Sequence, residues 1–124
     1  MLVTGILLTM VSLIVMAASS SKPAGDYGTL YGNLDKTNIL GARKFTASTS
    51  VDNAAPTLYT AMDVYAYPEG TVLGSYSNSV HSSKSMKLNS GWFNRDISAA
   101  STHEVRGVNS IVIYLLEENA GSIF

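Results

Sequence analysis

The sequence predicts an all-β protein, an antiparallel β-sandwich of about seven short strands preceded by an N-terminal hydrophobic helix. Apolar and polar residues alternate along several short segments, as they do where successive strand side chains point to opposite faces of a sheet. Turn residues separate these segments roughly every 8–12 positions, and no segment after residue 18 repeats with the period of a helix. A β-barrel is the alternative architecture.

Residues 1–18 are predicted to be a signal peptide or a hydrophobic anchor helix. The run is almost entirely apolar, small residues follow it, and it is shorter than the ~20 apolar residues of a membrane span. These features are typical of a secretory signal, so we expect cleavage between Ala17 and Ser21. No Lys or Arg precedes the run and Lys22 follows it, which leaves a retained anchor open as the alternative.

A linker and one domain account for the rest of the chain. Residues 19–26 contain Pro23 and Gly25 and show no period, which is typical of a linker. Residues 27–124 are predicted to form a single β-sandwich domain, long enough to bury a two-layer core. Its strands are predicted at Tyr27–Leu34, Lys44–Val51, Leu58–Tyr67, Thr71–Tyr76, Lys84–Leu88, Ile97–Val105 and Ile111–Leu116.

The segments between these strands carry turn and loop residues. A hairpin turn is predicted at 68–70, because Pro68 lacks an N–H for a ladder and Gly70 supplies a positive φ. Asp52–Pro56 and Ser77–Ser83 are predicted loops, and residues 117–124 are predicted to fray. The core is predicted from the most apolar faces and runs to include Met62, Val64, Ile111 and Ile113.

The composition narrows the class of function. The chain of 124 residues has no cysteine, which excludes disulfides and thiolate metal sites. Its net charge of −1 and its pI near 6.0 predict no basic surface for nucleic acid, so nucleic acid is not an expected partner. The domain is rich in Ser, Thr, Asn, Gly and Tyr, which suits an exported protein.

No residue pattern predicts catalysis, a metal or a cofactor, and we do not expect an enzyme. His81 and His103 are far apart, and neither stands in a metal-binding motif. His103 and Glu104 are neighbours in a predicted strand, so their side chains point to opposite faces and cannot act on one substrate atom. No serine lies in a GxSxG or SxxK motif.

The candidate binding residues are aromatic. Tyr59, Tyr65 and Tyr67 share the outer face of one predicted strand, and Tyr76 can join them across the hairpin. Exposed rings ~7 Å apart on a sheet suit stacking against an extended polymer such as a glycan. Trp92 in a predicted turn is a candidate anchor for a partner or a membrane surface. The alternatives are that a second layer covers the tyrosines and that Trp92 closes the end of the sandwich.

A short segment resembles a known family. Tyr76-Ser77-Asn78, His81 and Ser83-Lys84-Ser85 are similar to the YSN-x-x-H-x-SK segment of lactococcin-like secreted bacteriocins. These are small β-sandwich proteins that Gram-positive bacteria export to act on the envelopes of related cells. Met86 stands where that family has a second histidine. The resemblance implies an exported β-sandwich protein with a bacteriocin-like activity.

These observations predict a secreted or cell-surface bacterial protein that acts at the cell envelope without catalysis and is bacteriocin-like. The expected partners are an envelope glycan, a membrane surface or another protein, and a homo-oligomer is compatible with the sequence. The alternative function is a structural surface or filament subunit that retains residues 1–18.

Overall fold

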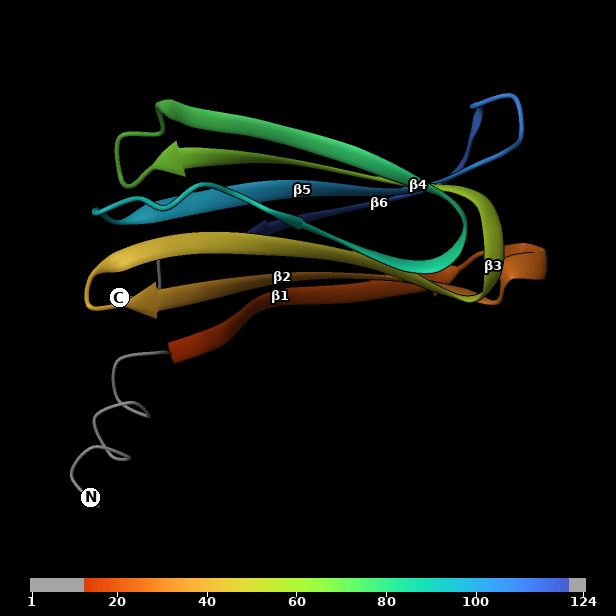
Figure 1. The fold of residues 1–124 in the computed structure, drawn as a ribbon, viewed down its shortest axis with the longest axis horizontal. Coiled ribbons are helices and arrows are strands. Elements are labelled where there is room, and N and C mark those ends of the chain that lie inside the picture. The colour runs from red at the N-terminus through yellow and green to blue at the C-terminus, as the bar shows by residue number, and fades with distance from the viewer. Residues whose placement is uncertain (1–12, 121–124) are drawn as a thin grey trace, which may run out of the picture.

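The computed structural model describes residues 13–120, which form one antiparallel sheet of six strands (Figure 1). The strands are β1 (Leu13–Pro23), β2 (Thr29–Ile39), β3 (Ala42–Ala66), β4 (Val72–Asn89), β5 (Ile97–Arg106) and β6 (Val112–Ala120), and a 3₁₀ turn, η1 (Gly25–Tyr27), follows β1. The sheet order is β1-β2-β3-β5-β6, with β4 paired to β3. The all-β antiparallel fold class is confirmed, and no α-helix occurs between residues 13 and 120.

Two predicted loops are wrong, because both segments continue a strand. Asp52–Pro56 lies within β3 and Ser77–Ser83 lies within β4. Ser77, Ser79 and their neighbours are weak strand formers by propensity, yet they pair with the apolar second half of β3, and that pairing overrides propensity. Six strands, two of them long, therefore replace the predicted set of short ones.

β3 and β4 bend together and fold the sheet into two layers. The register between them shifts from Ser50 to Ala55, where Pro56 offers no N–H to a ladder. Before the bend, β3 pairs with β2 and with the end of β4; after it, β3 pairs with β5 and with the start of β4. Figure 1 shows β3 crossing from one layer to the other at this point. The predicted turn at 68–70 joins β3 to β4.

The start of the described chain differs from the predicted helix and linker. Residues 13–23 form β1, whose backbone pairs with β2 from Leu13 opposite Asn38 to Pro23 opposite Thr29. A short apolar run fits a strand as well as a helix, and the free edge of β2 decides in favour of a strand. Residues 1–12, the rest of the predicted helix, lie outside the described residues, and the expected cleavage site falls within β1.

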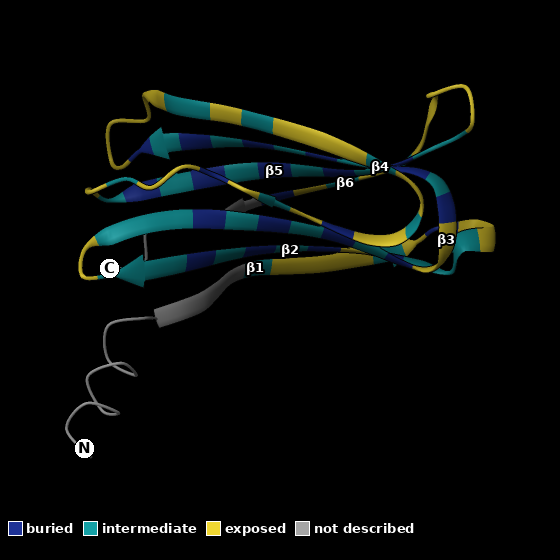
Figure 2. Cartoon of the chain, viewed as in Figure 1, coloured by how far each residue is buried: buried dark blue, intermediate teal, exposed yellow. Residues whose placement is uncertain are grey.

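The core lies between the two layers and follows the predicted alternation along β3. Met62 and Val64 are buried, as predicted, and β3 and β5 alternate buried and less buried residues along their length (Figure 2). The prediction for Ile111 and Ile113 is wrong, because these side chains are 62% and 46% exposed. β6 is an edge strand with one solvent face, so an apolar run there does not imply burial on both sides.

β6 also closes the interior on the side of β1 and β2. The Lys22 ammonium in β1 donates a hydrogen bond to the carbonyl oxygen of Leu115 in β6, at 3.0 Å. The prediction that residues 117–124 fray is wrong for residues 117–120, which pair with β5. Glu118 is thereby placed inside the protein, and this position matters for the site described next.

Candidate functional site

The predicted row of tyrosines lies on the outer face of β3, but its rings differ in exposure. Tyr59 and Tyr65 are half-buried, and Tyr67, just beyond the end of β3, is 44% exposed. The Arg106 guanidinium lies 3.8 Å from the centroid of the Tyr59 ring, and Glu104 accepts a hydrogen bond from Arg106 at 2.7 Å. Among these three tyrosines, Tyr59 is thus the one whose ring is covered by a guanidinium.

Tyr76 does not extend this row, because it lies on the opposite side of the sheet. It pairs with Met62, whose side chain faces the core, and its ring packs against the buried cluster around Phe45. The N–H of Gly91 donates to its hydroxyl oxygen at 3.0 Å. The position of Tyr76 is thus that of a partly buried residue at the border of the core.

Trp92 stands at the end of the layer formed by β2, the start of β3 and the end of β4. Its ring is 48% exposed, and the Lys44 ammonium lies 5.0 Å from its centroid. The next residue, Phe93, is partly buried and forms an isolated bridge with Arg43. The Trp92 ring is thus exposed, while the neighbouring Phe93 ring packs against the apolar cluster around Phe45.

A groove runs along the outer face of this same layer. It consists of three adjoining hollows of about 370, 510 and 310 Å³, each far larger than the ~30 Å³ share of one water molecule. The first and second hollows share Asn33 and Ser50, and the second and third share Asp35 and Lys87. From Tyr31 to Thr37 along β2 the groove extends for about 20 Å, at ~3.4 Å per residue.

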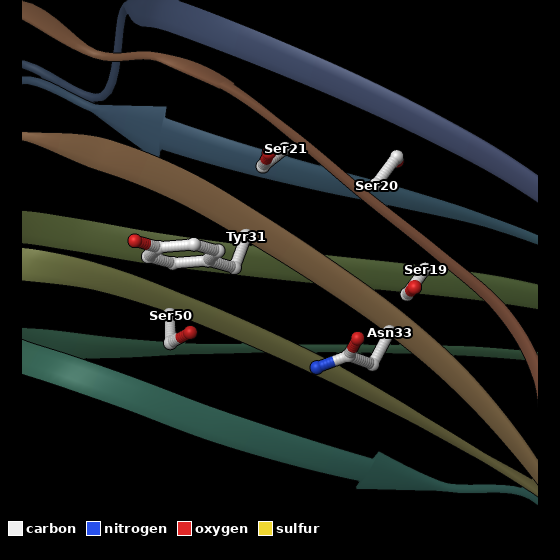
Figure 3. A pocket seen from close by; sticks show the side chains of 6 residues that line it. All are labelled: Ser19, Ser20, Ser21, Tyr31, Asn33 and Ser50. Atoms are coloured by element: carbon white, nitrogen blue, oxygen red, sulfur yellow. The ribbon is translucent and has the colours of Figure 1, made fainter.

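The groove is lined by the polar side chains that alternate with the core residues of its strands. Figure 3 shows the first hollow, surrounded by hydroxyl and amide groups and by the ring of Tyr31. The lining residues of the whole groove include Ser19, Ser21, Asn33, Asp35, Thr37, Lys44, Thr46, Ser48, Ser50, Ser85, Lys87 and Asn89. Partial burial raises the pKa of Asp35, and the Lys87 ammonium opposes this shift. The groove therefore offers many neutral donors and acceptors and few charges.

Sequence analysis did not identify this groove, although its signal was present. In the predicted strand Lys44–Val51, alternation puts Thr46, Ser48 and Ser50 on one polar face, as in an amphipathic strand. Asn33, Ser85 and Lys87 also lie in predicted strands, but Ser19, Ser21, Asp35, Thr37 and Asn89 lie in segments predicted as a linker, a loop or a turn. The alignment of the four strands is therefore not visible in the sequence.

The interior contains a second polar cluster, which we call the polar belt: Thr49, Thr60, Ser101, His103 and Glu118. Each member is buried, and Thr49, Thr60, Ser101 and His103 each lie on the apolar face of their strand. The His103 Nδ1 lies 2.7 Å from the Thr49 hydroxyl, which also shares a hydrogen bond with Thr60. The His103 Nε2 lies 2.9 Å from the Ser101 hydroxyl and 3.2 Å from Glu118 Oε1.

Burial disfavours the charged form of both ionisable members of the polar belt. It lowers the pKa of His103 to about 4, and burial together with the Asp35 carboxylate raises the pKa of Glu118 to about 7. Gly32 of β2 makes room for the pair, because a Cβ at this position would lie 2.7 Å from both Glu118 Oε1 and His103 Cδ2. The belt is thus a close contact between β2 and β6 across the interior.

The geometry of the polar belt does not match a nucleophilic triad. In such a triad the serine and the carboxylate bind opposite nitrogens of the histidine, whereas here Ser101 and Glu118 both face Nε2. Ser101 is also only 3% exposed, so a substrate does not reach its hydroxyl in this conformation. As predicted, Glu104 faces away from His103 and contacts Arg106 instead.

Lys36 is another fully buried ionisable residue, near one end of the interior. Its ammonium lies 5.9 Å from the centroid of the Phe45 ring. Burial lowers the pKa of Lys36, Arg43 lowers it further, and Asp96 raises it. Asp96 also lies 3.3 Å from the Arg43 guanidinium, so these groups form a charged cluster that closes the end of the apolar core.

The part of the chain from residue 13 to 120 contains no group of three His, Asp or Glu residues placed to hold a metal ion. Within the same range, no helix has the length and apolar character needed to cross a membrane. The chain matches no known family model, no curated protein and no solved structure.

Proposed function

We propose that this protein is an exported, non-enzymatic binding protein that acts at the cell envelope and holds an extended polar polymer, such as a glycan, in the groove. The observation that carries the proposal is the continuity of the groove. Its three hollows share lining residues and follow β2 and β3 for about 20 Å. An extended chain fits this shape better than a compact metabolite.

The chemistry of the groove supports a neutral, hydroxyl-rich ligand. Serine, threonine and asparagine side chains donate and accept hydrogen bonds, as sugar hydroxyls require. The Tyr31 ring borders the first hollow. The Trp92 ring makes a cation–π contact with Lys44, which lines the third hollow, so an aromatic ring lies near each end of the groove. Rings at these positions would pack against the apolar faces of sugar units.

The test compares the groove with the tyrosine row on the other layer. One variant carries Tyr31→Ser and Asn33→Ala, and its matched control carries Tyr65→Ser and Tyr67→Ser. We expect the groove variant to lose at least about tenfold in affinity for purified cell-wall glycan, a change of ~1.4 kcal/mol, while the control keeps its affinity. Loss of binding only in the control would move the site to the tyrosine row, and unchanged binding in both would refute the proposal.

The bacteriocin-like activity is a proposal that rests on the segment 76–85. Ser85 in this segment lines the groove, whereas Tyr76 packs against the core. Growth inhibition of Gram-positive bacteria by the purified protein tests the activity, with the groove variant as a control. No inhibition of any strain at micromolar protein would contradict it.

The alternative function, a structural surface or filament subunit, is favoured by one observation. The turn between β5 and β6 projects beyond the sheet (Figure 2). This turn and β6 carry exposed large apolar side chains, namely Val108, Ile111, Val112, Ile113 and Leu115. Exposed apolar strands at a sheet edge are typical of contacts between subunits. Sedimentation of the wild type and of Ile113→Lys at several concentrations separates this alternative from a monomeric binding protein.

A further inference from the structure

Glu118 combines burial with a position near the end of an edge strand. Its side chain is 3% exposed, and β6 pairs with β5 on one side only. Among the described residues, neither of its carboxylate oxygens has a hydrogen-bond partner, although Oε1 lies 3.2 Å from His103 Nε2. An ionised carboxylate in this setting would be strongly destabilising.

We propose that Glu118 and His103 form a proton-controlled latch, which holds the end of β6 against β2 while the pair carries a proton and releases that end when the proton is lost. The latch differs from the groove, which lies on the outer face of the other layer. The proposal therefore does not depend on the proposed function.

The two side chains share one proton over a wide range of pH. Burial disfavours the charged form of each group, so the pair is neutral between about pH 4 and about pH 7. Because the groups are in contact, they titrate as a unit. The Thr49 hydroxyl at Nδ1 can accept or donate a hydrogen bond, so the belt satisfies either tautomer of the ring.

The charged groups near the pair come from three strands, β1, β2 and β4. On β2, Asp35 disfavours ionisation of Glu118, and Lys36 lies over the Phe45 ring. Lys22 of β1 donates a hydrogen bond to the carbonyl oxygen of Leu115, and the ammonium of Lys87 on β4 opposes the rise that burial causes in the pKa of Asp35. β3 contributes only uncharged residues to the polar belt, Thr49 and Thr60.

Movement of β6 is the least costly way to hydrate an ionised Glu118. The strand has one ladder, to β5; elsewhere it is held by the hydrogen bond from Lys22 to the Leu115 carbonyl oxygen and by the packing of Leu116 on the cluster around Leu30. Beside Glu118 itself, β2 presents Gly32, which has no side chain to block movement of the carboxylate. Edge strands open locally more easily than central ones, whose amides are bonded on both sides. When the carboxylate ionises, we expect the residues around Glu118 to swing toward solvent while the β2–β3 pair stays intact.

Hydrogen exchange tests the latch in wild type, E118Q and the matched control E117Q, which changes the exposed carboxylate beside it. After correction for base catalysis, amides of residues 115–118 in wild type and E117Q should exchange at least about tenfold faster at about pH 8.5 than at about pH 6. Amides of β2 and β3 should not change. In E118Q, which mimics the protonated acid, the increase in β6 should be absent.

Two results would overturn the proposal. One is an equal increase in E118Q and wild type, and the other is no increase in wild type. If E118Q does not fold, the carboxyl carbon of Glu118 and the ring of His103 are followed by NMR in the wild-type protein. The latch requires both signals to change together near neutral pH, and a Glu118 that titrates near its ordinary pKa of 4.5 excludes it.

Discussion

The apolar clusters of the interior and the polar belt between them lie between the same two layers, but their stability depends on different conditions. One cluster, around Phe45 and Met62, is held by burial of hydrocarbon, which does not depend on pH. The belt is held by hydrogen bonds whose donors and acceptors change with protonation. One interior therefore combines packing whose contribution to stability is constant with hydrogen bonds whose contribution depends on pH.

The largest effect is expected from the apolar side of this comparison. Met62→Ala removes a buried side chain that is 2% exposed, and we expect a loss of ~2–5 kcal/mol in the free energy of unfolding. The loss should be the same at acidic and neutral pH, because no titratable group is in the cluster. Urea denaturation at two pH values measures it, and a pH-dependent loss would show that the two regions are coupled.

The polar belt should instead give opposite pH profiles in two single variants. In E118Q only His103 of the pair titrates, and its folded pKa of about 4 lies below the ordinary 6.5. Its contribution to the free energy of unfolding is therefore fully present above pH 6.5 and is lost as the pH falls toward 4. In H103Q only Glu118 of the pair titrates, and its folded pKa of about 7 exceeds the ordinary 4.5. Its contribution to the free energy of unfolding is therefore fully present below pH 4.5 and is lost as the pH rises toward 7. Each change amounts to roughly 3 kcal/mol over its range.

Wild type should show a flatter profile than either variant, because the folded pair and the unfolded pair each hold one proton between about pH 4.5 and 6.5. Thermal unfolding across this range measures all three proteins. Parallel profiles in E118Q and H103Q would contradict the assignment of these pKa shifts.

The apolar clusters were partly predictable from sequence, and the polar belt was not. Alternation along residues 58–66 identified Met62 and Val64 as buried, because the period of a strand is a local property. The same alternation puts Thr49 and Thr60, and Ser101 together with His103, on the more apolar faces of their predicted strands. That these positions meet depends on the register of four strands and on the bend of β3, which no local pattern specifies.

The candidate groove was hidden for a related reason. Its polar residues come from β1, β2, β3 and β4, and those of β1, of the second half of β2 and of the end of β4 lie outside the predicted strands. Residues 19–21 were predicted as a linker because serine and proline are common in loops. The free edge of β2 supplied the backbone partners that turned this segment into a strand.

A smaller effect is expected where the belt meets β2. Gly32→Ala places a methyl group against Glu118 Oε1 and the His103 ring, each 2.7 Å from the added carbon, so β2 and β6 must separate slightly. We expect a loss of ~1–3 kcal/mol, typical of overpacking. Gly91→Ala is the matched control, since its added carbon meets only the Tyr76 hydroxyl at 3.2 Å. Equal losses in the two variants would show that the contact at Gly32 is loose.

The smallest effect is expected from Ile113→Ala on the outer face of β6. Ile113 is as apolar as Met62, but its side chain is 46% exposed, so its truncation should cost no more than about 1 kcal/mol. Denaturation at two protein concentrations makes the test sharper. A loss as large as that of Met62→Ala, growing with concentration, would show that a second copy covers this face in solution. That outcome would favour the subunit alternative over a monomeric binding protein, because a monomer leaves this strip in contact with water.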